Sequence, residues 1–444
     1  MQISGHFYEA DMTFSSQALL IRGLRKLFRQ KIGFLLFMLA VTASLGWWTA
    51  KAHGAGFALI QQGTAAMAQG NAFVADASDA SAIFYNPAGL NQLKTPQVYV
   101  GTFLNYPDRN YSGDGLDSQT NHRLYRSLTT YIAIPVHDRV ALGIGFFSPF
   151  GLGTAWPPTW AGRYLTTYSK LQTYNLNPVI SVKVLNNLSL AAGVDFLWSR
   201  VKLKRKVQVL GGRFPDGELE LNGDGHGTGY NFGLLYEPLS GVKLGVSYRS
   251  QIAVTHSGDL TTTLPAPFPP STIQGSAGIV YPASLTMGIA YSRLKPFTFE
   301  FDTTWTGWSS YSKLKVNLDQ PQNGVSTSTI PKNWHDAWAF RFGANYEIRP
   351  GMKVRAGYIY DLTPVPDSSF DPQVPDANRH IFTVGGDIKV LKRFTLGIAY
   401  NYILVEPRTK NNTIVANGVP APLQANGKYT SDVHSLGLSC AFQF

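Results

Sequence analysis

The strictest pattern in this chain is the alternation of apolar with small or polar residues over its last ten positions. Successive side chains of a β-strand point to opposite faces, so this segment has one apolar and one polar face. A soluble sheet with a buried face gives the same alternation. The small polar face and the final aromatic residue instead favour the last strand of a bacterial outer-membrane barrel, with lipid on one side and lumen on the other. The apolar members are Leu436, Leu438, Cys440, Phe442 and Phe444.

Four more segments, 285–291, 297–302, 338–348 and 394–402, alternate in the same way. The charged residues in them fall on the polar face. An open sheet edge in lipid would leave backbone N–H and C=O groups unpaired, so such a sheet has to close on itself. The alternation therefore predicts an all-β fold, an antiparallel transmembrane β-barrel. The inward-facing charged residues are Glu300, Asp302 and Arg341.

Short and long connections alternate along the body, as periplasmic turns and outer loops do in a barrel. We count about 14 strands between them, and single-chain bacterial barrels have even numbers. The expected strands lie near 96–106, 124–135, 139–148, 171–184, 188–207, 227–237, 242–253, 280–293, 297–305, 332–348, 352–361, 379–390, 393–405 and 428–444. The expected long outer loops are 107–123, 149–170, 208–226, 254–279, 306–331, 362–378 and 406–427.

Composition excludes several other classes of protein. Charged residues are 15% and aromatic residues 13% of the 444, with a mean hydropathy of −0.07. A helical membrane bundle would be far more hydrophobic, and a disordered chain would lack the aromatic residues. The single cysteine, Cys440, rules out a disulfide framework and a cysteine-based zinc site. The net charge of +11 invites a nucleic-acid function, but the sequence contains no nucleic-acid-binding motif. We expect no nucleic-acid partner, metal or other cofactor.

The first 52 residues have the organisation of an export signal with an N-terminal extension. A basic stretch at 22–31 precedes the uncharged apolar run Ile32–Trp48. Ala50-Lys51-Ala52 then fits the A-x-A cleavage pattern. A transmembrane anchor is the alternative, although the run is at the short limit for spanning a membrane. We predict cleavage after Ala52 and a location in the bacterial outer membrane.

Residues 53–94 do not alternate. Small residues dominate, with scattered large apolar ones such as Phe57, Phe73 and Ile83. A periplasmic tail is the simpler interpretation, but it would not need these apolar side chains. A 14-stranded barrel is also too wide for its own inward side chains to fill. We predict that 53–94 form a plug with short helices, the hatch, inside a barrel made by 95–444.

Several motifs resemble the FadL-type (OmpP1/FadL/TodX) outer-membrane transporters, which carry long-chain fatty acids and, in relatives, aromatic hydrocarbons. The resemblance spans roughly 55–444 and implies a 14-stranded barrel with an N-terminal hatch. The motifs are Ala55-Gly56-Phe57, the run Gly63 to Gly70, Val74-Ala75-Asp76-Ala77-Ser78-Asp79-Ala80-Ser81, Tyr85-Asn86-Pro87-Ala88-Gly89-Leu90, Phe150-Gly151-Leu152-Gly153-Thr154, Trp160-Ala161-Gly162-Arg163-Tyr164, Trp308-Ser309, Trp334-His335-Asp336-Ala337-Trp338, Pro364-Val365-Pro366-Asp367 and Pro375-Asp376-Ala377-Asn378-Arg379.

A fatty-acid site needs an apolar cavity and one or two cations for the carboxylate. The resemblance places the carboxylate-binding arginine at Arg205 and offers Lys332 as the second cation. It also matches Phe57 to an aromatic residue that lines the same pocket. For Arg205 a solvated rim position is an equal alternative, and for Phe57 simple packing of the hatch against the wall. Lys204 and its neighbours, on the opposite face, we interpret as a rim cluster, solvated or bound to lipopolysaccharide.

Gly151 and Gly153 follow a proline in a strand-like setting, which predicts a kink. The alternative is an ordinary loop start. In the family such a kink opens a lateral hole in the barrel wall, next to the Asn-Pro-Ala turn of the hatch. The resemblance places that turn at Asn86, Pro87 and Ala88, and a family acid near the opening at Asp361.

Enzyme chemistry finds no support. His434 and Ser435 are adjacent in one strand, so their side chains point to opposite faces and cannot pair. We expect a non-enzymatic channel for passive diffusion of hydrophobic molecules, preferably long-chain fatty acids, with a gate and a lateral opening. The alternatives are a channel for neutral or aromatic hydrocarbons and, less favoured, a general aqueous porin. Expected partners are the ligand, outer-membrane lipid and lipopolysaccharide, and the barrel assembly machinery through Phe444. The family implies a monomer.

Overall fold

The computed structural model describes residues 56–113, 115–322, 324–416 and 418–444. The predicted signal and its cleavage site lie outside these ranges. No helix among the described residues is long and apolar enough to cross a membrane.

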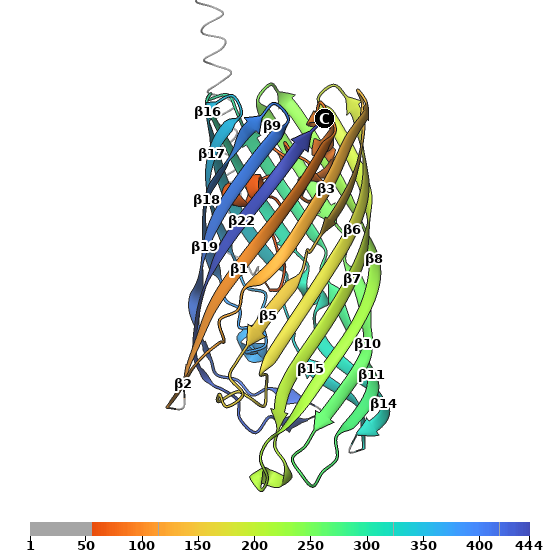
Figure 1. Cartoon of the computed structure of the whole chain (residues 1–444), viewed down its shortest axis with the longest axis vertical. Coiled ribbons are helices and arrows are strands. Elements are labelled where there is room, and N and C mark those ends of the chain that lie inside the picture. The colour runs from red at the N-terminus through yellow and green to blue at the C-terminus, as the bar shows by residue number, and fades with distance from the viewer. Residues whose placement is uncertain (1–55, 114, 323, 417) are drawn as a thin grey trace, which may run out of the picture.

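Fourteen antiparallel strands form a closed barrel, as predicted (Figure 1). Pairing of the first strand with the last, from Gln97 with Gln443 to Ser112 with Lys428, closes the wall. Nine wall strands are continuous: β1 (Gln97–Gly113), β3 (Tyr125–His137), β6 (Tyr168–Leu185), β7 (Leu188–Val207), β8 (Gly217–Leu239), β17 (Met352–Asp361), β18 (Arg379–Leu391), β19 (Phe394–Lys410) and β22 (Gly427–Gln443). Five consist of two elements: β4 (Val140–Phe147) with β5 (Gly151–Ala155), β9 (Val242–Arg249) with β10 (Ile252–Thr263), β12 (Ser284–Tyr291) with β11 (Ser271–Tyr281), β13 (Phe297–Thr306) with β14 (Lys313–Gln322), and β16 (Ala337–Arg349) with β15 (Val325–Pro331).

Side chains alternate between the two faces of this wall. In β22 Ser435 and Ala441 are buried on the inside, whereas Leu438 and Phe442 are 41% and 38% exposed on the outside. This outer face matches the apolar band that a transmembrane barrel presents to lipid. The same band includes exposed Leu128, Ile144, Val194, Phe232, Val384 and Ile398 from other strands.

On one side of the barrel the strands run further than the sequence predicts. β10 and β11 occupy the expected loop 254–279, and β14 and β15 occupy the expected loop 306–331. Figure 1 shows these elements at the end of the barrel remote from the C-terminus. Their outward positions carry mainly polar residues, so the apolar alternation stops before the strand pairing does. The smaller elements are β2 (Leu116–Gln119), β20 (Val415–Ala416), β21 (Val419–Pro420), η2 (Leu210–Gly212), η3 (Trp308–Ser310) and η4 (Asp367–Ser369).

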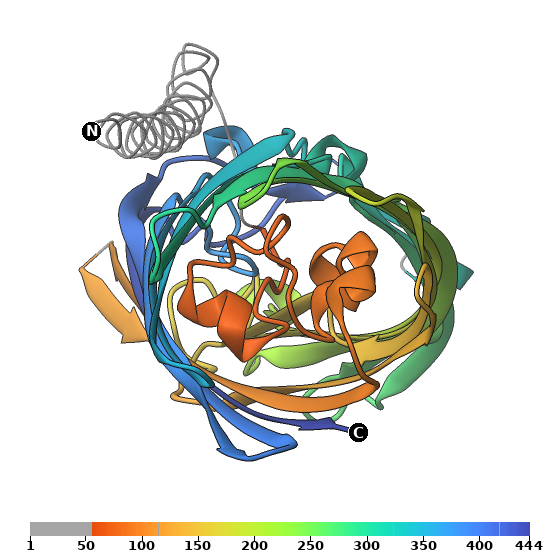
Figure 2. The ribbon, with the colours of Figure 1, turned by 90° about the horizontal axis from the view of Figure 1, so that it is seen from above.

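The hatch lies inside the ring of strands (Figure 2). It contains the predicted short helices, α2 (Thr64–Ala68), α3 (Ala82–Tyr85) and the 3-10 helix η1 (Pro87–Gln92). Its large apolar side chains pack against the inward residues of the wall, which supplies the filling that a wide barrel needs. Four of them are fully buried: Met67, Phe73, Ile83 and Leu90.

Candidate functional site

The wall is interrupted in its third strand, where the sequence predicts a kink. β4 ends at Phe147 and β5 begins at Gly151. β4 pairs with both β3 and β6, but within the described chain β5 pairs with β6 alone. The part of β3 from Tyr125 to Thr129 therefore has no ladder partner on the β5 side. A gap results between β3 and β5.

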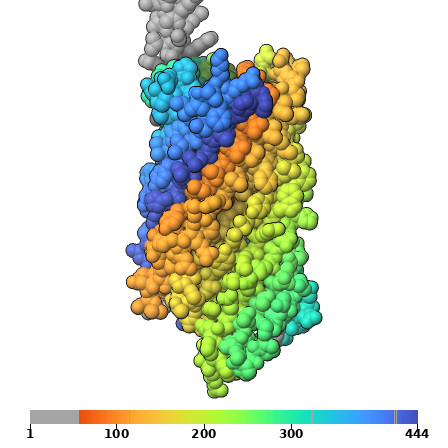
Figure 3. Space-filling model, viewed as in Figure 1, coloured from red at the N-terminus to blue at the C-terminus, as the bar shows by residue number. Residues whose placement is uncertain are grey.

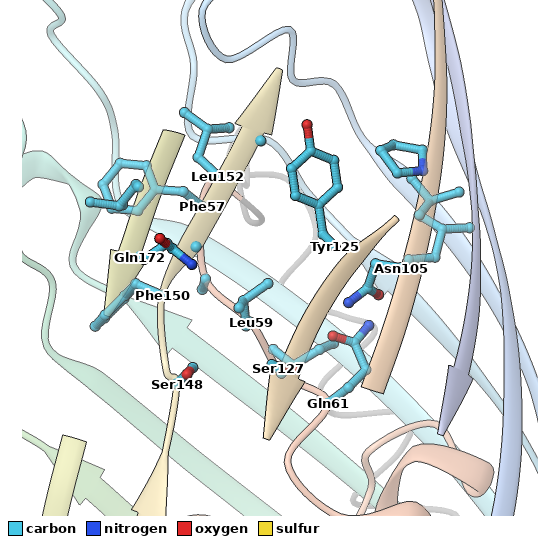
Figure 4. A pocket seen from close by; sticks show the side chains of 18 of the residues that line it. Phe57, Leu59, Gln61, Asn105, Tyr125, Ser127, Ser148, Phe150, Leu152 and Gln172 are labelled. Carbon is cyan, nitrogen blue, oxygen red and sulfur yellow. The ribbon is translucent and has the colours of Figure 1, made fainter. Parts of the chain in front are cut away.

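The first residues of the hatch enter this gap. The Leu59 N–H donates to the Pro149 carbonyl (2.8 Å), and the Gly151 N–H donates to the Phe57 carbonyl (2.9 Å). A Cβ on Gly151 would lie 2.7 Å from the Leu59 side chain, and a Cβ on Gly153 would lie 2.0 Å from the Tyr125 ring. The two glycines thus leave room for one side chain of the hatch and one of β3. Figure 4 shows both side chains beside the strand that carries Leu152.

A cavity of about 800 Å³ passes through this gap. Its inner lining includes Phe57, Asp361 and Ile381, and the two glycines border it. Its outer lining includes Leu128, which is 60% exposed on the lipid-facing surface. Figure 3 shows the molecule from the side on which β1, β3 and β5 lie. Because its lining includes both interior residues and the lipid-facing Leu128, the cavity connects the interior of the barrel with the outside of the wall.

Phe57 lies at the centre of an aromatic cluster at the inner end of the cavity. Its side chain belongs to the hatch and is 5% exposed. Most of the ring contacts are edge-to-face, the arrangement that aromatic rings prefer. The Phe57 ring therefore occupies a pocket shaped for an apolar group. The surrounding rings, with their centroid distances from Phe57, are Trp308 (4.6 Å), Trp334 (5.6 Å), Tyr311 (5.7 Å), Phe150 (6.2 Å) and Tyr281 (6.2 Å).

Two long loops cover the cluster from the extracellular side. In the loop 156–167, Trp156 stacks on Trp160 with ring centroids 4.3 Å apart. The indole N–H of Trp156 donates to the carbonyl of Pro372, in the loop 362–378. Trp156 and Trp160 are each 2% exposed, so this covering is closely packed. The loops that carry the Trp-Ala-Gly-Arg-Tyr and Pro-Val-Pro-Asp motifs therefore close the barrel mouth.

A polar cluster holds the start of the hatch near Asp361. The Gly56 N–H donates to Asp376 (3.1 Å), and Arg379 donates both to Asp376 (2.6 Å) and to the Gly56 carbonyl (3.0 Å). Asp361, at the end of β17, lines the same cavity with Asp376 and Arg379. The predicted acid thus lies near the opening, on the interior side of it.

Arg205 lies at the extracellular end of β7, on the inner face that the sequence assigns to it. Its side chain is exposed, and its guanidinium is 3.4 Å from the Tyr164 carbonyl. It does not belong to the lining of the cavity. The lysines of the opposite face point outward and form ion pairs across the hairpin, such as Lys204 with Glu218 (3.0 Å). This arrangement agrees with a rim position for the lysines.

Lys332 is buried close to the aromatic cluster, two residues before Trp334. Its ammonium donates to Asp371 (2.7 Å), and its side chain is 4% exposed. Burial works to lower the pKa of Lys332, but the Asp371 carboxylate and Tyr311 raise it above the ordinary lysine value overall. Lys332 is therefore charged and already paired. No contact between Lys332 and Arg205 is present in the described chain, so the two predicted cations are not brought together.

The Asn-Pro-Ala turn does not belong to the lining of the cavity, so its place beside the lateral opening stays a prediction. The Asn86 amide donates to the Val74 and Leu234 carbonyls (2.7 and 2.9 Å), and Ser181 donates to the Ala88 carbonyl (3.4 Å). Pro87 begins η1, which packs against β6, β7, β8 and β4, and more sparsely against β3. The lining of the gap comes instead from 56–61 of the hatch. A tight polar turn can support the plug from any strand, and the motif alone does not identify that strand.

Two inward carboxylates of β13 hold the middle of the hatch, a role that the sequence analysis did not assign. Asp302 accepts from the N–H groups of Phe73 and Val74 (2.8 and 3.0 Å). Glu300 accepts from the next two N–H groups, at Ala75 and Asp76 (2.7 and 3.1 Å). Both carboxylates are buried, at 2% exposure or less. The only signal in the sequence was a pair of acids on the inner face of one strand.

Comparison with protein families finds one match over almost the whole chain. Residues 45–444 match the model of the outer membrane protein transport proteins (OMPP1/FadL/TodX). Among curated relatives, a putative outer membrane protein of Neisseria meningitidis serogroup B is 26% identical, and the match covers 89% of this chain and 96% of the relative. A long-chain fatty acid transport protein of Escherichia coli O6:H1 is 25% identical, with 80% and 88% covered.

Solved structures of similar fold include transporters named for different substrates. A Pseudomonas aeruginosa FadL homologue superimposes with a TM-score of 0.77 at 21% identity, covering 88% of this chain and all of that one. The Ralstonia pickettii toluene transporter TbuX gives a TM-score of 0.66 at 18% identity, covering 87% of this chain and all of that one. At these identities the likeness shows the fold, a barrel with an internal plug.

Proposed function

Because the chain belongs to the family of outer membrane transport proteins (OMPP1/FadL/TodX), we propose that it takes up hydrophobic molecules by passive diffusion, and that long-chain fatty acids are its preferred ligands. The observation that carries the proposal is the cavity that joins the Phe57 pocket to the outside of the wall. A channel for water-soluble molecules has no use for an exit toward lipid. An apolar molecule can leave there without entering water.

The proposed route runs from the barrel mouth to the lateral gap, and the Phe57 ring occupies the pocket between them. The molecule enters at the extracellular mouth, under the loops 156–167 and 362–378, and reaches the aromatic cluster. There it takes the place of the Phe57 ring. Movement of 57–59 away from the interrupted strand then opens the gap, because these residues make the backbone bonds to Pro149 and Gly151. Tyr125 is the remaining side chain across the opening.

For a fatty acid the two cations act at different depths. Arg205, exposed on the inner face at the mouth, attracts the carboxylate first. Lys332 lies deeper, beside the aromatic cluster, where an entering carboxylate would compete with Asp371 for the ammonium group. Curated relatives named as long-chain fatty acid transport proteins, at 23–25% identity, support this choice of ligand.

A channel for neutral or aromatic hydrocarbons is the second candidate. Two observations favour it: Lys332 is already neutralised by Asp371, and the pocket around Phe57 consists of aromatic rings. Toluene transporters also share the fold. In this case neither Arg205 nor Lys332 contributes to ligand binding.

The remaining parts of the proposal concern the membrane and assembly. The protein acts as a monomer, and no part of the function requires catalysis. The outward lysines at the barrel rim bind lipopolysaccharide phosphates. Phe444, which is 58% exposed and packs on Phe442 with ring centroids 4.9 Å apart, is the contact for the barrel assembly machinery.

Uptake by cells distinguishes these functions. A bacterial host that lacks its own fatty-acid and hydrocarbon channels would express the chain, and uptake of oleic acid, toluene and a small sugar would be measured. We expect oleic acid uptake well above the empty-vector control and no gain for the sugar. Toluene uptake without oleic acid uptake would support the hydrocarbon channel. Sugar uptake alone would contradict both and indicate an aqueous porin.

A further inference from the structure

Three buried polar side chains form a connected group in the apolar wall next to Phe57. Ser199 comes from β7, His256 from β10 and Tyr281 from β11, and they are 1%, 2% and 0% exposed. The Ser199 hydroxyl lies 2.7 Å from the His256 Nε2 and 2.5 Å from the Tyr281 hydroxyl. We call this group the polar triad. The wall around it is apolar, with buried Leu197, Ile252, Val254 and Ile279.

Packing of the apolar wall does not explain why these three residues are polar. A buried polar group costs free energy unless it is hydrogen-bonded, and an apolar side chain of similar shape would avoid that cost. The three side chains come from separate strands, so each had to be polar independently for the group to form. Their location is also specific, because the Tyr281 ring contacts both Phe57 (6.2 Å between centroids) and Phe150 (4.7 Å). The Tyr281 ring thus borders the pocket that the Phe57 ring fills, with Ser199 and His256 behind its hydroxyl.

The hydrogen-bond chain leaves the tyrosine hydroxyl able to bind one more group. The His256 Nδ1 lies 3.3 Å from the Ala277 carbonyl, which favours a proton on Nδ1. The Nε2 then accepts from Ser199, Ser199 accepts from Tyr281, and the Tyr281 oxygen keeps a free lone pair for a donor. With both imidazole nitrogens protonated, the Nδ1–H bond to Ala277 stays, the bonds from His256 to Ser199 and from Ser199 to Tyr281 reverse, and Tyr281 has its proton free for an acceptor. The same hydroxyl can therefore accept from a ligand hydroxyl or donate to a ligand carboxylate.

We infer that the polar triad is a subsite for the oxygen head group of an amphipathic ligand, with Tyr281 as the contact residue. In the structure as described, the Phe57 ring occupies the volume that the ligand would fill. When the ligand replaces it, the surrounding aromatic rings contact the apolar part of the ligand next to its head group. This inference rests on the proposed uptake of hydrophobic molecules and adds a preference among them. Ligands that end in a carboxyl or hydroxyl group bind more tightly than hydrocarbons of the same length. The preference requires neither Arg205 nor Lys332.

The test measures binding of three matched ligands to the purified full-length protein in detergent: oleic acid, oleyl alcohol and the corresponding hydrocarbon. In the unmodified protein we expect the acid and the alcohol to bind more tightly than the hydrocarbon. Tyr281→Phe and Ser199→Ala should each weaken acid and alcohol binding by about 10-fold, the effect of one lost buried hydrogen bond. Binding of the hydrocarbon should change less than about 2-fold.

Tyr402→Phe is the matched control, because it removes the same hydroxyl from a lipid-facing position of β19 and should change nothing. Heat-modifiable mobility on gels verifies that each variant is a folded barrel. Equal losses for all three ligands, or no loss in either variant, would overturn the inference while the proposed function stands. An unmodified protein that binds none of the three ligands would instead count against the proposed function.

Discussion

The hatch is attached to the wall in two different ways, and the difference separates a fixed part from a movable one. The hatch anchor, residues 73–76, binds two buried carboxylates through four consecutive N–H groups. The hatch tip, residues 57–61, makes two neutral backbone bonds to the interrupted strand. The residues on either side of it are also held, Gly56 by Asp376 and Arg379 and Gln62 by the Ser148 carbonyl. The anchor is thus held by four hydrogen bonds to two buried side chains, and the tip by two backbone bonds. A plug built in this way can release its tip while the anchor stays bound.

The neighbourhood of each part fits this division. The anchor contacts β13, which pairs with β16 along its whole length and with β12 from Phe299 to Thr306. The tip contacts β5, which has a ladder partner on one side only in the described chain. The two backbone bonds of the tip therefore lie where the wall has a ladder partner on one side only.

Loss of the anchor should have the largest effect. In the double variant Glu300→Ala with Asp302→Ala, four buried N–H groups lose their acceptors, and each unsatisfied donor costs about 1–3 kcal/mol. We expect the plug to leave the lumen, so that the open fraction of the channel rises at least about 100-fold. Conductance in planar bilayers measures it. Glu347→Ala, an acid on β16 with no role in the hatch, is the control. Closed channels in the double variant would show that the anchor is dispensable.

Obstruction of the gap should come next. A Cβ on Gly153 would lie 2.0 Å from the Tyr125 ring, so Gly153→Val should force the two strands into a blocked arrangement. We expect uptake to fall by about 10-fold or more while ligand binding in detergent persists. Gly278→Ala, where nothing lies within 4 Å of the new Cβ, is the matched control.

A second substitution sharpens that result. If steric conflict with Tyr125 is the cause, Tyr125→Ala should restore uptake in the Gly153→Val background, since it removes the ring that the valine meets. Uptake assays on the two single variants and the double variant measure the coupling. Failure of the rescue would mean that the valine acts by weakening the strand rather than by filling the gap.

Removal of the Phe57 side chain should have a moderate effect of opposite sign. Phe57→Ala empties the pocket, so a ligand no longer has to displace the ring, and we expect binding to tighten by about 10-fold. Ligand titration of the purified protein measures this. Phe84→Ala, another aromatic residue of the hatch but outside the cluster, is the control. Weaker binding to Phe57→Ala would mean that the ring is part of the ligand site rather than its occupant.

The smallest effect concerns the mouth. Arg205 is exposed, and exposed ion pairs contribute about 0.2–1 kcal/mol. Arg205→Ala should therefore weaken oleic acid binding by about 2-fold to 5-fold and leave oleyl alcohol unchanged. Lys204→Ala, on the outward face, serves as the control. A loss of 100-fold for the acid alone would place Arg205 in the pocket itself and make the mouth the primary site.

The fold followed from the sequence because lipid and lumen impose opposite demands on alternate residues. β22 shows this directly: the apolar Leu438 and Phe442 face lipid, and the small Ser435 and Ala441 face the interior. β14 and β15 were missed because, beyond the lipid, neither face of a strand has to be apolar. β14 still alternates, with Leu314, Val316 and Leu318 facing inward, but this run is short and its outward residues are polar, so it was included in the loop.

The site was predicted in part, and the missing part depends on contacts between distant segments. The kink at Gly151 and Gly153 is a local property of the backbone and was visible. The anchor on Glu300 and Asp302 joins residues more than 220 positions apart, and the polar triad joins three strands. Only the closed barrel brings these side chains together. The pairing of Lys332 with Asp371 likewise depends on how two loops fold into the mouth.

One consequence of the Phe57 ring in its pocket concerns selection. The ring is tethered to the protein, so it competes with every ligand at an effective concentration of order millimolar, however dilute the ligand is. A molecule that binds the pocket weakly is excluded even where it is abundant, as membrane lipids and detergent-like molecules are. The pocket therefore selects molecules by their affinity rather than by their concentration. Between two transport events the Phe57 ring keeps the apolar wall of the pocket covered.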